Sequence, residues 1–269
     1  MPRKKMDNRI GETKLNYQNS IMTIILYNNV QDIVVEFQDK YKSMVHTTYQ
    51  NFKNGSVKSP YCPSVLRVGA IGSKYNPYDI YYDNNGKKIN KVKKEYRLWK
   101  HMLGRCFDND YKEKQPTYKD VTCVDDWLLF EKFYEWVKGQ ENYDKWLNGD
   151  LWCLDKDILC KGNKIYSPDA CCLVPMKVNN LFISNKVNRG NQPIGVVKFN
   201  NKYRAICNNQ LLGKEVHLGM FNSQMEAFEA YKTYKESIIK QVAKEEFDNK
   251  NITKKCYNAM IHYEIEPTD

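Results

Sequence analysis

The sequence lacks the long apolar runs and the glycine motifs that identify several large classes of protein. No run approaches the ~20 apolar residues that a membrane-spanning helix needs, and no apolar segment follows the basic first residues, as it would in a secretory signal. The patterns G-x-x-x-x-G-K, G-x-G-x-x-G and G-x-S-x-G are also absent, so the enzyme classes that use them have no support. We therefore expect a cytoplasmic protein with no membrane partner.

Histidine is scarce, and the cysteines follow no known pattern. Four histidines are spread over 269 residues, too widely for a histidine-rich metal site. The nine cysteines are odd in number and contain no C-x-x-C pair, so the sequence indicates neither a disulfide framework nor a zinc site. We expect reduced and mostly buried cysteines, as in a reducing compartment.

Positive charge, in contrast, is plentiful and unevenly distributed. The net charge is +10, and residues 1–100 contain 18 lysines and arginines against 8 aspartates and glutamates. Residues 101–192 and 193–269 are each close to neutral. A basic surface rich in aromatic residues is typical of proteins that bind polyanions, most simply nucleic acid. A merely solvated, lysine-rich surface is the alternative.

The first 94 residues predict a small sheet and a basic linker. Alternating apolar residues predict three antiparallel strands, at residues 21–27, 32–37 and 41–46. One helical turn ended by Gly55 follows them. We assign residues 1–71 to an N-terminal β module that we expect to bind nucleic acid. Residues 72–94 contain six lysines interleaved with tyrosines, and they are predicted to be either a basic arm along a phosphate backbone or a solvated linker.

Residues 95–190 are predicted to combine helices with a β-hairpin. Aromatic residues at helical spacing in residues 95–107 and 127–140 predict two helices, and such stripes belong to the core more often than to a binding surface. Residues 153–182 then predict an apolar strand, a polar loop, a second apolar strand and a helix opened by Pro175.

Residues 191–269 have the clearest pattern. They predict three strands joined by polar turns, at residues 195–199, 202–208 and 215–221. A long helix follows, with Asn222 or Ser223 as its N-cap and with Glu226 completing a capping box. The predicted fold class is therefore α+β, with a small N-terminal antiparallel β module, a central domain of hairpin and helices, and a C-terminal three-stranded sheet plus helix.

The C-terminal segment resembles a known DNA-binding family. The run Gly195-Val196, then "KYRAIC", "VHLGMF" and "EAFEAYK", is similar to the Apetala-type domain of plant ethylene-response factors, which also occurs in phage and mobile-element endonucleases. In that family the sheet enters the major groove of double-stranded DNA. The resemblance implies that exposed residues of the first two strands contact DNA, namely Lys198, Asn200, Lys202, Tyr203 and Arg204.

The central segment resembles the phage branch of the His-Asn-His (HNH) endonucleases. The resemblance rests on residues 153–182 and on "YRLWKHMLGRC" and "VTCVDDWLLFEKFYEWV" before them. It implies a ββα-metal core that holds one Mg²⁺ or Mn²⁺ ion, with Asp155 and Asn179 as ligands and Asp157 as an additional or alternative ligand. The general base of the family falls on Lys156, and its orienting asparagine falls on Ala170.

These two departures put the chemistry in question. Hydrolysis needs a group that takes a proton from water, but a lysine is protonated at neutral pH, and between two aspartates Lys156 is better suited to clamp a phosphate. Ala170 can orient nothing. Three explanations stay open: a natural inactive relative kept for DNA binding, an active variant whose catalytic base is His101, or an engineered alanine at position 170.

Two functions follow, and a third ranks below them. The first is a phage-type homing endonuclease that acts in the cytoplasm of a bacterial host and cleaves DNA. The second is a catalytically inactive HNH-like DNA-binding regulator, or a host-takeover or anti-defence factor. The third is an inhibitor that binds a protein partner by mimicking or competing with DNA, and the basic first third argues against mimicry of DNA itself.

Overall fold

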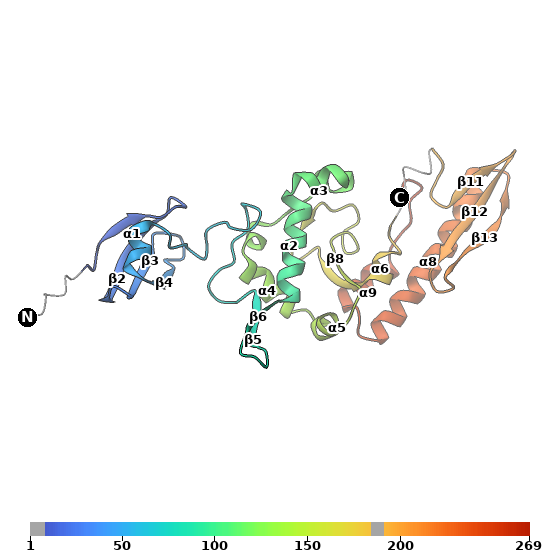
Figure 1. Cartoon of the computed structure of the whole chain (residues 1–269). Coiled ribbons are helices and arrows are strands. Elements are labelled where there is room, and N and C mark those ends of the chain that lie inside the picture. Colours follow the sequence, from blue (N-terminus) through green and yellow to red (C-terminus); the bar gives the residue numbers. More distant parts are fainter. Residues whose placement is uncertain (1–8, 184–190) are drawn as a thin grey trace, which may run out of the picture. The chain divides into compact units, whose positions relative to one another are not determined.

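The computed structural model describes residues 9–183 and 191–269 (Figure 1). The chain divides into two compact units, Met1–Glu135 and Trp136–Asp269. The fold is mixed α+β, as predicted, with a four-stranded antiparallel sheet, a central helical region and a three-stranded antiparallel sheet packed on a long helix. The first eight residues lie outside the described residues, and they carry part of the basic charge. The predicted domain boundary at residue 190 also lies outside them.

The first sheet has the strand order β1-β2-β3-β4 and is antiparallel throughout. Its strands are β1 (Thr13–Leu15), β2 (Ile21–Asn29), β3 (Asp32–Phe37) and β4 (Met44–Thr47). Alternate residues of β2 and β3 pack with Phe52 of α1 (Tyr49–Asn54) in one apolar core. Gly55 ends α1 in a left-handed conformation, with φ of 73°, as its position in the sequence predicts. Strand β1 was not predicted, because its three residues are all exposed.

The segment predicted to be a linker contains a β-hairpin, formed by β5 (Tyr78–Tyr82) and β6 (Lys88–Val92). Asp83 stabilises the turn, because its carboxylate accepts hydrogen bonds from the backbone N–H groups of Asn85 and Lys87, at 2.9 and 2.8 Å. Gly86 supplies the positive φ of 74° that such a turn requires. Every residue of β5 is exposed.

The rest of the first unit is helical. It contains α2 (Lys94–Phe107), α3 (Asn109–Lys114), η1 (Pro116–Tyr118), β7 (Thr122–Cys123), η2 (Asp125–Leu128) and the start of α4 (Phe130–Lys138). The predicted helix at residues 127–140 is therefore a 3-10 turn followed by α4. The aromatic stripes do form core, as predicted: Trp99, Trp127 and Phe130 are fully buried. The Trp99 indole N–H donates to the carbonyl of Trp127 at 2.7 Å.

The second unit begins with α5 (Tyr143–Asn148) and a hairpin followed by a helix. Strand β8 (Trp152–Asp155) pairs antiparallel with β10 (Cys172–Pro175), and Pro175 is the N-cap of the short helix α6 (Met176–Asn179). The predicted order of strand, loop, strand and helix is therefore confirmed. The loop also contains the two-residue strand β9 (Ile165–Tyr166).

The C-terminal sheet has the order β11-β12-β13. Its strands are β11 (Val196–Phe199), β12 (Lys202–Asn209) and β13 (Lys214–Phe221), and they are followed by α8 (Gln224–Asp248) and α9 (Lys254–Ile261). Ser223 and Glu226 form the predicted capping box at the start of α8. One apolar core joins the sheet to α8 and α9 and includes Ala205, Cys207 and Tyr231.

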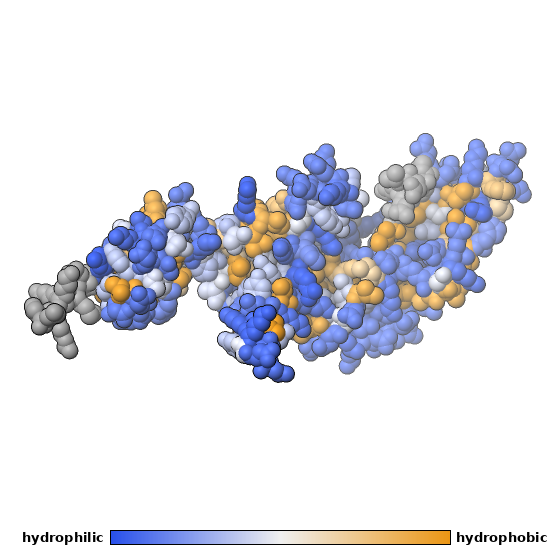
Figure 2. All heavy atoms as spheres, viewed as in Figure 1, coloured by the Kyte–Doolittle hydropathy of each residue, from blue (hydrophilic) through white to orange (hydrophobic). Residues whose placement is uncertain are grey.

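The surface seen in Figure 2 is mainly hydrophilic, with apolar residues in small groups. Among the described residues, no helix combines the length and the apolar character needed to cross a membrane. Cys160 is exposed, and the other cysteines are wholly or partly buried, as predicted.

Candidate nucleic-acid interface

The C-terminal sheet has one face packed on α8 and one face without a covering helix among the described residues. Side chains alternate along β12. Ala205 and Cys207 are therefore buried towards α8, whereas Arg204 and Ile206 point to the opposite side of the sheet. We call the opposite side the free face and define it by seven side chains: Val197, Phe199, Lys202, Arg204, Ile206, His217 and Met220. The pairing register places them in cross-strand rows.

Close packing behind the sheet fixes the position of this face. Gly195 has φ of 76° and precedes β11. A Cβ atom at Gly195 would lie only 2.0 Å from the ring of Tyr231 on α8. Only glycine fits there, both because of its backbone conformation and because the aromatic ring covers it. This contact explains the Gly195-Val196 pair that is part of the family resemblance.

Arg204 lies at the centre of the free face. It is opposite Val197 of β11 and Met220 of β13, both of which are exposed. The Nε–H of Arg204 is buried and has no hydrogen-bond partner among the described residues. A buried donor without a partner costs about 1–3 kcal/mol. Arg204 therefore carries an unsatisfied hydrogen-bonding group at the centre of the free face.

The other predicted contact residues are distributed differently. Lys202 lies on the free face, opposite Phe199. Asn200 lies in the turn between β11 and β12, exposed and with a positive φ of 53°. Lys198 and Tyr203 are opposite each other on the α8 side of the sheet, where Lys198 is exposed.

The expectation that Tyr203 is exposed on the reading face is corrected. Tyr203 has the same orientation along β12 as Ala205 and Cys207, and it packs, partly buried, against the apolar core. Sequence reasoning also missed Phe199 and Met220, which are 55% and 40% exposed. Strict alternation from the buried Ala205 would have identified the orientation of Tyr203. The place of Met220 depends on the register shift between β12 and β13, which no alternation within one strand predicts.

In the hairpin of the second unit, Asp155 caps a loop. It lies at the end of β8, and its Oδ1 accepts hydrogen bonds from the backbone N–H groups of Asp157 and Ile158, at 2.7 and 2.8 Å. Burial raises the pKa of Asp155 in spite of these two bonds, and the charge of Asp157 adds to the increase. The carboxylate is thus already used in holding the loop after β8.

Lys156 neutralises the second candidate ligand. Its side chain is only 8% exposed, and its Nζ donates to Oδ1 of Asp157 at 2.6 Å. The carbonyl of Lys156 accepts a hydrogen bond from Asn163, which organises the loop further. An ammonium group at this distance places positive charge where a divalent cation would have to bind. In this arrangement Oδ1 of Asp157 and Oδ1 of Asp155 both have partners within the chain.

The remaining positions of the HNH pattern add little to such a site. Ala170 is buried, and its N–H donates to the Ser167 hydroxyl at 3.3 Å. Asn179 is half-buried at the end of α6. The described residues contain no group of three or more His, Cys, Asp or Glu side chains arranged to bind a metal ion.

His101, the alternative base, belongs to α2 in the first unit, whereas Asp155 belongs to the second. Burial lowers the pKa of His101, and the charges of Arg105, Arg97 and Lys100 lower it further. This imidazole is therefore in a positively charged environment.

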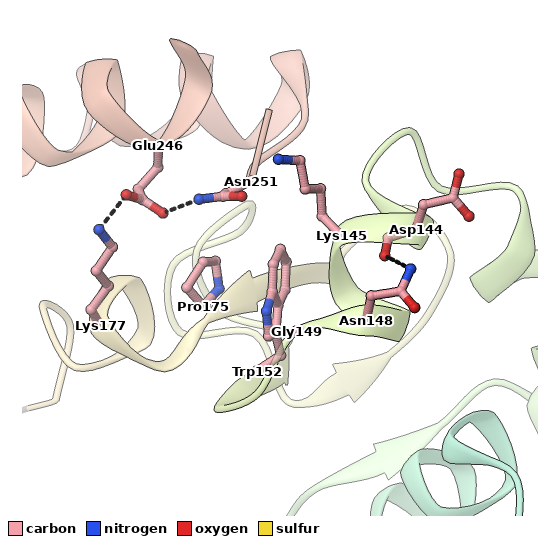
Figure 3. A pocket seen from close by; sticks show the side chains of 9 residues that line it. All are labelled: Asp144, Lys145, Asn148, Gly149, Trp152, Pro175, Lys177, Glu246 and Asn251. Atoms are coloured by element: carbon pink, nitrogen blue, oxygen red, sulfur yellow. Dashed lines mark hydrogen bonds and ion pairs between the residues drawn. The ribbon is translucent and has the colours of Figure 1, made fainter. Parts of the chain in front are cut away.

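A cavity of about 510 Å³ lies at the other end of the same hairpin (Figure 3). Trp152 and Pro175 line it together with residues of α5 and the end of α8. Glu246 is fully buried there, and its Oε1 lies 2.5 Å from Nζ of Lys177 in an ion pair without hydrogen-bond geometry. Its Oε2 accepts a hydrogen bond from Asn251 at 3.0 Å. The ion pair and the hydrogen bond hold Glu246 to partners within the chain, so we interpret the cluster as structural.

Comparison of the chain with family models, with curated proteins and with solved structures found no match.

Proposed function

We propose that the protein binds double-stranded DNA through the free face of its C-terminal sheet, as a β-sheet reader of the major groove. The observation that carries this proposal is the position of Arg204. Arg204 lies in register between the cross-strand neighbours Val197 and Met220, and its buried Nε–H lacks a partner among the described residues. An arginine in such a position is suited to donate two hydrogen bonds to O6 and N7 of guanine, the commonest specific contact in the major groove.

Apolar residues around Arg204 support the same function. Phe199 and Met220 are exposed beside it, and apolar contacts with thymine methyl groups are a second means of reading the major groove. Residues 193–269 contain 11 lysines and arginines against 10 acids. Most of the affinity for phosphates must therefore come from the basic first third of the chain, because phosphate neutralisation dominates the affinity of DNA-binding proteins.

We further propose that the HNH-like hairpin holds the protein on DNA without cleaving it. Lys156 is paired with Asp157, Asp155 caps the loop, and Ala170 has no side chain that orients a base. An active phage-type homing endonuclease is the second candidate, and the hairpin β8–β10 followed directly by α6 favours it.

Incubation with supercoiled plasmid separates these two candidates. We expect that the protein leaves the plasmid intact in the presence of Mg²⁺ or Mn²⁺, because Lys156, which falls on the position of the general base, is paired with Asp157. The same assay with Ala170→Asn tests whether the orienting residue alone restores cleavage. Nicked or linear plasmid from the unchanged protein, absent when EDTA is added, would establish the endonuclease instead.

A thermal measurement tests the metal site directly. A cation that binds only the folded state raises Tm by mass action. We expect no change in Tm at about 10 mM Mg²⁺ or Mn²⁺, a large excess over a weak site with Kd of roughly 10⁻³ M. We also expect Asp155→Asn to retain full stability at neutral pH, since an amide oxygen can still accept both backbone N–H groups and the burial of a charge is removed. A metal-dependent rise in Tm that Asp155→Asn abolishes would refute this view.

A further inference from the structure

The first unit contains a cavity of about 520 Å³ between the hairpin β5–β6 and helix α2. Tyr78 and Lys91 of the hairpin line it, together with four residues of α2: Tyr96, Arg97, Lys100 and His101. The α2 residues are three and four positions apart, which places them on one side of the helix.

The cations of this cavity are not neutralised. Among the described residues, the side chains of Lys91, Arg97 and Lys100 form no ion pair or hydrogen bond, and no carboxylate lines the cavity. Asp79 of the hairpin is instead paired with Lys93, at 3.7 Å. Like charges at this spacing on a helix cost a few tenths of a kcal/mol, roughly 0.2–0.5 for each pair. An anion in the cavity would turn this cost into a gain.

The walls of the cavity are aromatic and anchored in the core. Tyr78 and Tyr96 have ring centroids 6.0 Å apart, and Tyr96 packs edge to face against the buried Phe130 at 5.3 Å. The hairpin continues outward with exposed tyrosines at positions 81 and 82 and with lysines at 87 and 88. Aromatic walls beside cations are suited to a backbone phosphate and the sugar attached to it.

We propose that this cavity binds backbone phosphates of DNA and forms a second contact, separate from the free face of the C-terminal sheet. The inference rests on the proposed function only in taking DNA as the polyanion. Because phosphates carry no sequence information, the cavity contributes affinity and register but not specificity.

The test compares two double variants of the intact chain by fluorescence anisotropy with duplex DNA. In Arg97→Gln/Lys100→Gln the cavity loses two charges. In the control Lys114→Gln/Lys119→Gln the same unit loses two exposed charges away from the cavity. For the cavity variant we expect the slope of log K against log salt to become shallower by about 1–2, and binding at about 100 mM salt to weaken roughly tenfold or more. The loss should be equal on all duplex sequences.

Three results would overturn the proposal. Equal losses in the two double variants would show that only total charge matters. Unchanged binding by the cavity variant would show that DNA does not contact the cavity. The third result concerns free phosphate as the ligand. In that case inorganic phosphate would raise Tm of the unchanged protein but not of the cavity variant, while both bound DNA equally. The cavity variant tests the second contact by its salt dependence, and Arg204→Ala tests the proposed function by its sequence preference. Failure of one proposal is therefore distinguishable from failure of the other.

Discussion

Arg204→Ala is expected to weaken binding at the preferred DNA site by about 1–3 kcal/mol, or roughly 5- to 150-fold in Kd, and to leave binding to random duplexes much less affected. The reason is the position of Arg204 in the middle of the free face, where the proposed mode of binding has its guanidinium contact a base edge rather than a single phosphate. The variant should not lose stability, because the substitution removes a buried N–H group that has no partner among the described residues. Binding isotherms on specific and random duplexes, together with Tm, measure all three quantities.

Two controls make this result specific. Lys198→Ala removes one positive charge from the same sheet, but from the side that faces α8, so it should weaken specific and random binding by the same small factor. Arg204→Lys keeps the charge and loses the planar fork, so it should behave like Arg204→Ala on the specific duplex. If Arg204→Ala weakens binding to both kinds of duplex equally, Arg204 is a phosphate contact and the proposed reading face is wrong.

Lys177→Ala is expected to destabilise the second unit by about 3 kcal/mol, the lower end of the range for breaking a buried ion pair. The fully buried carboxylate of Glu246 would then keep only the Asn251 amide as its partner. The lower end applies because the side chain of Lys177 is 54% exposed and its charge is partly solvated. The free energy of unfolding in urea measures the effect.

The same lysine provides its own control, since it also pairs with Glu245 at 3.2 Å. The Glu245 side chain is 47% exposed, so Glu245→Gln should change the free energy of unfolding by less than about 1 kcal/mol. In the double variant Lys177→Ala/Glu246→Leu, no buried charge remains unpaired, so much of the lost stability should return. A double variant no more stable than Lys177→Ala would show that the loss comes from packing rather than from charge.

Elements with a regular apolar period were predictable, and those without one were not. The capping box at Ser223 and the alternation of β11 to β13 determined the C-terminal unit closely. The hairpin β5–β6 was missed although its turn carries a D-N-N-G signal, because β5 is exposed on both faces and has no apolar alternation. Helix α9 was missed because it is short and buries only Cys256 and Met260.

The candidate site shows the same limit. Arg204 is a predicted contact residue that lies on the free face, whereas the orientation of Tyr203 depends on which residues of β12 face α8. The ion pair of Lys156 with Asp157 joins neighbours in sequence, yet the burial of Lys156 comes only from the folded loop. Glu246 is fully buried, and its partner Lys177 lies far away in the sequence, so no local pattern contains the information on this pair.

Selection of bound duplexes from a library of random sequences, followed by sequencing of the retained DNA, tests the central claim most directly. If the free face reads the major groove, the unchanged protein enriches one short motif, and Arg204→Ala loses the preference at one base pair of that motif. If the unchanged protein retains DNA without enriching any motif, or if Arg204→Ala enriches the same motif as strongly, the C-terminal sheet is not the reading surface and the proposed function is contradicted.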